Sequence, residues 1–232
     1  MSLHVLPAGT DVAEMAFFDT DDLPMPTTVD REVIEALEAA QRLISLPTGS
    51  DGSYLLHLYV DETIPANIQR YCATSDAKAG VFVAVRGHVA FGGLESAHAA
   101  FESNPNVRSD ATIPAGRYDY RAFRTDFPEA VVRAAMKVER TAAERWISRA
   151  PSFALLTAAG LAIAMLAWPS PLAALLVMLA GVVLAIWLWR SPLASELRTR
   201  REEAQLDFPN VVLTLQSTPP GPRAAVASTM PG

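Results

Sequence analysis

The sequence predicts an α+β cytoplasmic domain joined to a two-helix transmembrane hairpin. Residues 150–189 form a run of 40 residues that contains no Asp, Glu, Lys, Arg, His, Asn or Gln. The rest of the chain resembles an ordinary acidic globular protein, in which helical and alternating apolar patterns follow one another. The segregation of these two kinds of sequence indicates a globular part and a lipid-embedded part.

The N-terminal half carries the patterns of the globular part. Residues 1–29 are acidic and rich in proline and threonine, which predicts a flexible arm. Residues 30–127 predict the α+β domain, opening with a helix over REVIEALEAAQRLISL, residues 31–46. Strands are predicted at Tyr54–Val60, on both sides of Arg86-Gly87 in residues 80–93, and within Ile113–Phe127.

The C-terminal half is predicted to be helical up to its last segments. Pro128 opens a connecting helix over residues 128–150, and residues 151–189 form the hairpin, with arms at 151–168 and 172–189. A juxtamembrane helix follows at 190–207. Residues 208–217 read as a strand that pairs with an edge of the soluble domain, and residues 218–232 as a disordered tail.

The hairpin prediction depends on length and on the prolines in the middle of the run. A membrane span needs about 20 apolar residues, and Pro169 and Pro171 divide the run into two arms of nearly that length. A helical hairpin buried in a soluble protein would instead show a polar stripe on one arm. Apart from Ser152 at the entrance, Thr157 is the only polar residue within the two arms, so we expect lipid around them.

Residues flanking the arms predict their orientation. Arginines precede the first arm and follow the second, whereas the WPSP turn between them has no charge. The positive-inside rule then places both termini in the cytoplasm of a bacterial cell, with two spans in the inner membrane. The residues expected at the membrane interfaces are Trp146, Arg149, Trp168, Trp187, Trp189 and Arg190.

Small residues recur at four-residue spacing on both arms. They are Ala154, Ala158 and Ala162 on the first arm, and Gly181 and Ala185 on the second. Such ridges allow helix backbones to approach closely. They predict that the hairpin packs on itself, and self-association into a homo-oligomer is the alternative left open. Transport is not expected, because neither arm contains an ionisable group.

The sequence offers little for catalysis. Cys72 is the only cysteine, the four histidines have no metal-ligand spacing, and no phosphate-binding or nucleophile motif is present. We therefore predict no enzyme activity, no catalytic or metal site and no cofactor. Residues 1–110 contain 16 acidic and 6 basic residues, a balance that argues against nucleic acid as a partner.

A protein partner is the remaining prediction, with two groups of candidate binding residues. Asp19, Asp21 and Asp22 belong to the predicted arm, and a solvated acidic segment is the alternative reading. Arg117, Asp119 and Arg121 share one face of a predicted strand, near Arg124. For these residues a face of cross-strand salt bridges is the alternative.

In layout the chain resembles membrane-anchored immunity proteins of bacterial toxin–immunity pairs. The resemblance lies in its small size, a lone interaction domain, β segments such as IPAGRYDY, and a two-span anchor. It implies neutralisation of a toxin by stoichiometric binding at the membrane. An accessory subunit of a membrane protein complex is the alternative function, and a membrane-tethered enzyme a further one.

Overall fold

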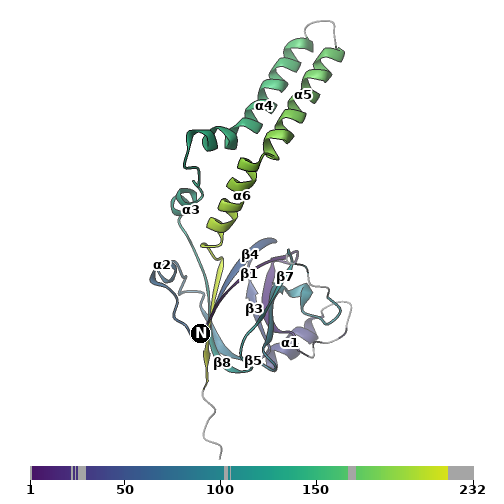
Figure 1. Ribbon diagram of the computed structural model, residues 1–232. Coiled ribbons are helices and arrows are strands. Elements are labelled where there is room, and N and C mark those ends of the chain that lie inside the picture. The colour runs from purple at the N-terminus through teal and green to yellow at the C-terminus, as the bar shows by residue number, and fades with distance from the viewer. Residues whose placement is uncertain are drawn as a thin grey trace, which may run out of the picture. The chain divides into compact units, whose positions relative to one another are not determined.

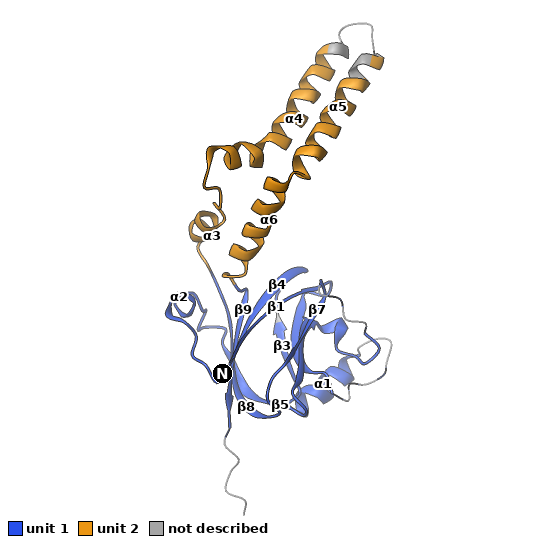
Figure 2. Cartoon of the chain, in the orientation of Figure 1, with its two compact units in different colours: residues 1–126, 209–232 blue, residues 127–208 orange. Residues whose placement is uncertain are grey.

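The computed structural model describes residues 2–21, 23, 25, 30–101, 104, 106–166 and 171–218. The chain divides into two compact units, coloured separately in Figure 2: residues 1–126 with 209–232, and residues 127–208. We call them the β unit and the helical unit and describe each by itself. Asp22, Trp168 and most of the predicted tail lie outside the described residues.

The β unit consists of two β-sheets with short helices, which confirms the α+β class (Figure 1). One sheet has five strands in the order β1-β4-β9-β8-β5, and the other has four in the order β3-β2-β6-β7. All neighbouring strands are antiparallel except β4 and β9, which are parallel. The strands are β1 (Ser2–Thr10), β2 (Glu14–Asp19), β3 (Leu43–Pro47), β4 (Gly52–Val60), β5 (Lys78–Ala84), β6 (His88–Gly93), β7 (Arg108–Thr112), β8 (Gly116–Arg124) and β9 (Val211–Ser217).

The main core lies between the two sheets. Because side chains alternate along a strand, each strand contributes every second residue to it, as Phe17 of β2 and Phe82 of β5 do. Their ring centroids are 5.0 Å apart and both side chains are fully buried. The sheets also meet at their margins, where Gly9 N donates to Val107 O and Val83 N donates to Gln41 O. These bonds cover strand edges that would otherwise be open to further pairing.

Strand β9 lies inside the five-stranded sheet. The sequence predicts a strand at this place but at an edge, whereas the structure pairs it with β4 on one side and β8 on the other. Val211, Leu213 and Leu215 point into the core and are at most 3% exposed. A strand that buries three apolar residues on one face and pairs on both sides is a central strand.

The flexible arm predicted over residues 1–29 is wrong for most of its length, because Ser2–Thr10 and Glu14–Asp19 form strands β1 and β2. Residues 1, 22, 24 and 26–29 of the predicted arm lie outside the described residues. Met15, Ala16, Phe17 and Phe18 are completely buried. The acidic residues around this apolar stretch predict a solvated arm. The free energy gained by burying four consecutive apolar side chains, on both faces of an inner strand, instead favours a strand.

The predicted helix over residues 31–46 is also too long. Helix α1 (Arg31–Ala39) ends where Gln41 takes a positive φ of 60°, and the chain then forms β3. Leu37 of α1 packs with Phe18 and Leu43 in a second apolar cluster on the outer face of the four-stranded sheet. A short helix α2 (Ala66–Gln69) and a 3₁₀ turn η1 (Leu94–Ser96) complete the unit.

The helical unit contains α3 (Glu129–Ala135), α4 (Ala142–Leu166), α5 (Pro171–Trp189) and α6 (Pro192–Gln205). The single connecting helix predicted over residues 128–150 is therefore interrupted. A capping box explains the restart at α4: Glu144 N donates to Thr141 Oγ1, and the Glu144 carboxylate accepts from Thr141 N. Helix α4 continues through Pro151.

Helices α4 and α5 pack as a hairpin. Among the described residues, α4 is long and apolar enough over Ala142–Ala164 to cross a membrane. The segment Leu175–Trp189 reaches such a length and composition only together with α6, from which it is bent by 59°. Core helices of soluble proteins can have the same length and composition, so the transmembrane hairpin remains a prediction.

Candidate functional site

Asp19 and Asp21, predicted to bind a partner, are buried structural carboxylates. Asp19 is 0% exposed; it accepts from the guanidinium of Arg42 at 2.7 Å and from Val85 N at 2.7 Å. Asp21 accepts from Arg86 N at 3.0 Å, and its carboxylate lies 3.0 Å from His88 Nδ1. The two side chains thus fix the turn between β5 and β6 and are not available to a partner. Asp22 is outside the described residues.

The environment of Asp21 changes its acidity. Burial opposes its negative charge, but the hydrogen bonds from His88 and from Arg86 N, with the nearby positive charges, hold the pKa of this carboxyl below its usual value. Asp21 is therefore ionised over the physiological pH range.

Arg117, Asp119 and Arg121 lie on the outer face of β8, as alternation along the strand predicts. All three are exposed. Their side chains form no ion pair with any of the described residues, which argues against the alternative of a salt-bridge face. The register places Asp119 between half-buried Val81 of β5 and exposed Gln216 of β9. We call this surface the β8 strip.

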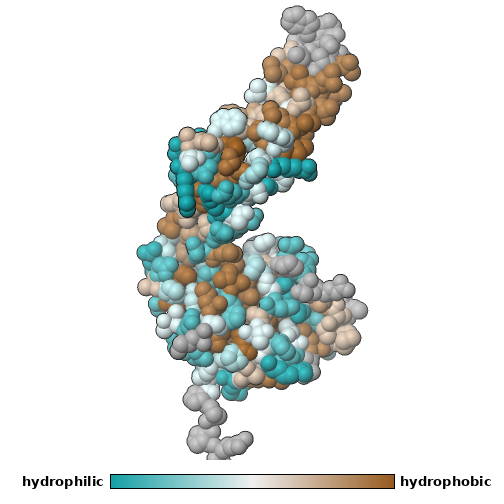
Figure 3. All heavy atoms as spheres, viewed as in Figure 1, coloured by the Kyte–Doolittle hydropathy of each residue, from teal (hydrophilic) through white to brown (hydrophobic). Residues whose placement is uncertain are grey.

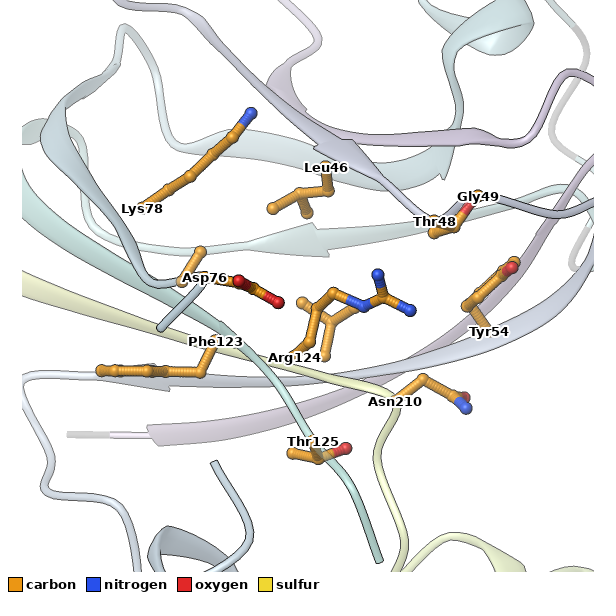
Figure 4. Close-up of a pocket in the computed structure, with 12 residues that line it drawn as sticks. Leu46, Thr48, Gly49, Tyr54, Asp76, Lys78, Phe123, Arg124, Thr125 and Asn210 are labelled. Carbon is orange, nitrogen blue, oxygen red and sulfur yellow. The ribbon is translucent and has the colours of Figure 1, made fainter. Parts of the chain in front are cut away.

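A pocket of about 330 Å³ opens between the ends of the two sheets (Figure 4). This pocket is lined by Arg124, which the sequence groups with the residues of the β8 strip. The pocket is also lined by Lys78, Asp76 and Tyr54, none of which is a candidate from the sequence. Strand alternation is the signal that separates Arg124 from the strip, because position 124 faces the same side of β8 as the buried Tyr118 and Ala122.

The residues predicted to lie at the membrane–water interfaces are exposed wherever the structure describes them. Trp146, Trp187 and Trp189 are 64%, 68% and 54% exposed, and Arg149 and Arg190 are also exposed. The guanidinium of Arg198 lies 4.3 Å from the ring centroid of Trp189 and donates to the carbonyl of that residue, a cation–π contact typical of arginine beside tryptophan. Trp168 lies outside the described residues.

The small residues of the two arms lie where α4 and α5 meet. Ala158, Ala162, Gly181 and Ala185 are buried and Ala154 is half-buried. A Cβ atom on Gly181 would lie 2.2 Å from that of Ala158, so the arms are in close contact here. Beside this contact runs an apolar groove of about 610 Å³ that includes Ala154, Ala158 and Gly181.

Outward-facing side chains of the hairpin are apolar and exposed, and they form the brown surface over these helices in Figure 3. Leu156, Ile163, Leu175 and Leu179 are each at least 59% exposed. Soluble proteins seldom leave so continuous an apolar surface in water. It therefore requires a cover of lipid or protein.

Histidine and cysteine side chains have structural surroundings in the β unit. Burial raises the pKa of the Cys72 thiol, which disfavours the nucleophilic thiolate. His57 is 4% exposed with Nδ1 3.4 Å from the Tyr59 hydroxyl, and His88 is held by Asp21. Among the described residues, no three His, Cys, Asp or Glu side chains gather as a metal site.

No protein-family model and no curated protein matches the chain. Solved structures that align with it include the product described as Crocagin biosynthetic gene J, with 21% identity and a TM-score of 0.38 over 54% of this chain and 79% of that one. Another is ComJ from Bacillus subtilis, an inhibitor of the DNA-degrading activity of NucA, with 13% identity and a TM-score of 0.35 over 53% of this chain and 81% of that one. Both likenesses are too low to assign a function to this chain.

Proposed function

We propose that this chain is a bacterial inner-membrane protein that uses its hairpin to hold a cytoplasmic protein-binding unit at the bilayer. Its specific role in this proposal is that of an immunity protein, which neutralises a toxin by stoichiometric binding. The observation that supports the anchor best is the exposed apolar surface of α4 and α5.

The dimensions and flanks of the hairpin fit a bilayer. Helix α5 has 19 residues, which at about 1.5 Å per residue gives roughly 28 Å, close to the thickness of the hydrocarbon core. Exposed Trp146, Trp187 and Trp189 lie toward the ends of the arms that carry the arginines, where indole rings and guanidinium groups meet the headgroups. Both termini then lie on the cytoplasmic side.

A binding role is supported by the β8 strip. Three exposed charges, which form no ion pair within the described residues, lie near half-buried Val81 and can make charge-assisted hydrogen bonds without first breaking such a pair. The surrounding unit is acidic overall, so attraction to a basic toxin would speed the encounter. The raised pKa of the Cys72 thiol and the engagement of His88 favour this role over catalysis.

A competition assay between bacteria tests the immunity role. Cells that lack this chain should be killed when grown together with their parent strain, and the full-length chain should restore survival. A chain with both Arg117→Glu and Arg121→Glu should restore it much less, whereas Arg31→Glu, an exposed arginine of α1, should restore it fully. Equal survival of the deleted and parent strains would reject the immunity role.

The groove along α4 and α5 favours a second candidate, an accessory subunit of a membrane protein complex. Grooves lined by small residues accept a neighbouring helix in lipid. In that case purification in mild detergent should recover the chain with other membrane proteins in fixed ratio, and Ala154→Leu, on the groove wall, should release them.

A further inference from the structure

We propose that the pocket of Arg124 binds a carboxylate on a short apolar stem, presented by the protein partner. The carboxylate belongs either to an acidic side chain or to the end of the partner's chain. This inference rests on the proposed function for the identity of the partner, but its chemistry follows from the pocket alone.

The position of Arg124 in its strand is the first argument. Tyr118 and Ala122, on the same face of β8, are buried in the core, and Tyr120 packs against it. Arg124 continues this inward-facing series at the open end of the sheets, with Val211 of β9 as its neighbour in register. The series therefore aims a cation at the space between the sheets.

The part of the chain that the structure describes supplies no counter-ion to Arg124 there. Among the described residues its side chain forms no ion pair, although the Asp76 carboxylate lines the same pocket. Figure 4 shows the guanidinium of Arg124 between Asp76 and Tyr54, with Thr48 above it. A guanidinium offers a planar set of donors that matches a carboxylate in a bidentate pair.

The charges of the pocket select a monoanion. Lys78 and Arg124 supply two positive charges and Asp76 one negative charge. The Lys78 ammonium already donates to Ser45 O at 2.6 Å, which fixes it at the rim. One net positive charge matches a carboxylate, and Asp76 repels a phosphate dianion more strongly than a carboxylate monoanion.

The walls of the pocket suit an apolar stem. Leu46, Ala122 and Val211 line it and are at most 7% exposed. The Tyr54 hydroxyl donates to Ser50 O at 2.7 Å, which orients the ring at the wall. A volume of about 330 Å³ lies at the lower end of the usual range for ligand pockets, roughly 300–1,000 Å³, and accommodates one inserted side chain or chain end.

Titration of the full-length chain in detergent micelles tests the proposal. Nuclear magnetic resonance signals of the Arg124 Nε–H and of the Ala122 methyl group report on the pocket. The probes are acetyl-Ala-Glu-Ala-amide, its glutamine analogue, acetyl-Ala-Ala-Leu with a free carboxyl end, and inorganic phosphate. We expect at least one carboxylate peptide to bind at least about tenfold more tightly than the glutamine analogue, as for one charge-assisted pair. The tighter of the two carboxylate peptides identifies the source.

Variants link this binding to Arg124. Arg124→Gln should weaken the binding, followed at the Ala122 methyl group, by at least about tenfold. Arg31→Gln, at an exposed arginine of α1 outside the pocket and the β8 strip, should leave it within about twofold, and β-sheet circular dichroism verifies the fold of both variants. Equal binding of the glutamine analogue, tighter binding of phosphate, no binding of any probe, or an unaffected Arg124→Gln variant would each overturn the proposal. Survival in the competition assay is a separate readout, so failure here leaves the immunity role standing.

Discussion

At the scale of single residues, the Asp21 carboxylate couples the stability of the β unit to pH. The pKa of Asp21 is lower in the folded chain than the value of about 3.9 expected for the unfolded chain. Its contribution to stability is therefore fully present above pH 4 and is lost as the pH falls through the folded pKa. We predict that Asp21→Asn lowers the free energy of unfolding at pH 7 by about 1–3 kcal/mol.

The same variant should lose less stability between pH 4 and pH 2 than the parent chain. Urea unfolding followed by β-sheet circular dichroism measures both effects. Exposed Asp51 provides the control, because Asp51→Asn should leave the pH profile within about 0.5 kcal/mol of the parent. An acid profile that Asp21→Asn does not change would show that other groups dominate.

At the scale of single helices, the same substitution of glycine by alanine should have opposite effects at two positions of the hairpin. Alanine usually stabilises a helix relative to glycine by about 1 kcal/mol. Among the described residues, nothing lies within 4 Å of a Cβ added to Gly160, whereas at Gly181 that atom would meet Ala158 at 2.2 Å. We predict that Gly160→Ala is neutral or stabilising and that Gly181→Ala destabilises the hairpin by about 1–3 kcal/mol. Thermal loss of the helical circular dichroism signal in micelles measures this, and equal shifts for both variants would contradict the close contact.

Strand β9 should be the most sensitive element of the β unit. Leu213 is fully buried, opposite Leu58 of β4 and Ala122 of β8. We predict that Leu213→Ala lowers the free energy of unfolding by about 2–5 kcal/mol, as expected for a cavity in a packed core. Gln216→Ala, in an exposed position of the same strand, should cost less than about 1 kcal/mol. Urea unfolding of both variants tests the difference.

The elements show what local sequence can reveal. The α+β class and strand β9 follow from alternation, which depends on neighbouring residues only. The burial of Asp19 could not be predicted in this way, because it is compensated by Arg42 and by the backbone of Val85, which are distant in sequence. The pocket of Arg124 likewise assembles lining residues from β3, β4, β5, β8 and β9, and no short motif records it.

At the scale of the whole molecule, the two units present different surfaces. Exposed apolar side chains of the β unit are isolated, as Val12 is, whereas those of α4 and α5 follow one another along both helices. Isolated exposure is normal for a globular protein in water. Continuous exposure along two helices is what a bilayer would cover.

This contrast leads to opposite expectations for the same kind of substitution. Leu156 and Leu179 are 70% and 59% exposed, so in water their replacement by arginine would change stability by about 0.5 kcal/mol or less. Within a bilayer, an arginine near the centre of a helix costs about 2.5–3.5 kcal/mol for insertion. We predict that the double variant Leu156→Arg, Leu179→Arg shifts much of the full-length chain out of carbonate-washed membranes, while Val12→Arg stays with them as the parent does. Full retention of the double variant, or recovery of the parent chain in the aqueous fraction, would mean that protein and not lipid covers α4 and α5.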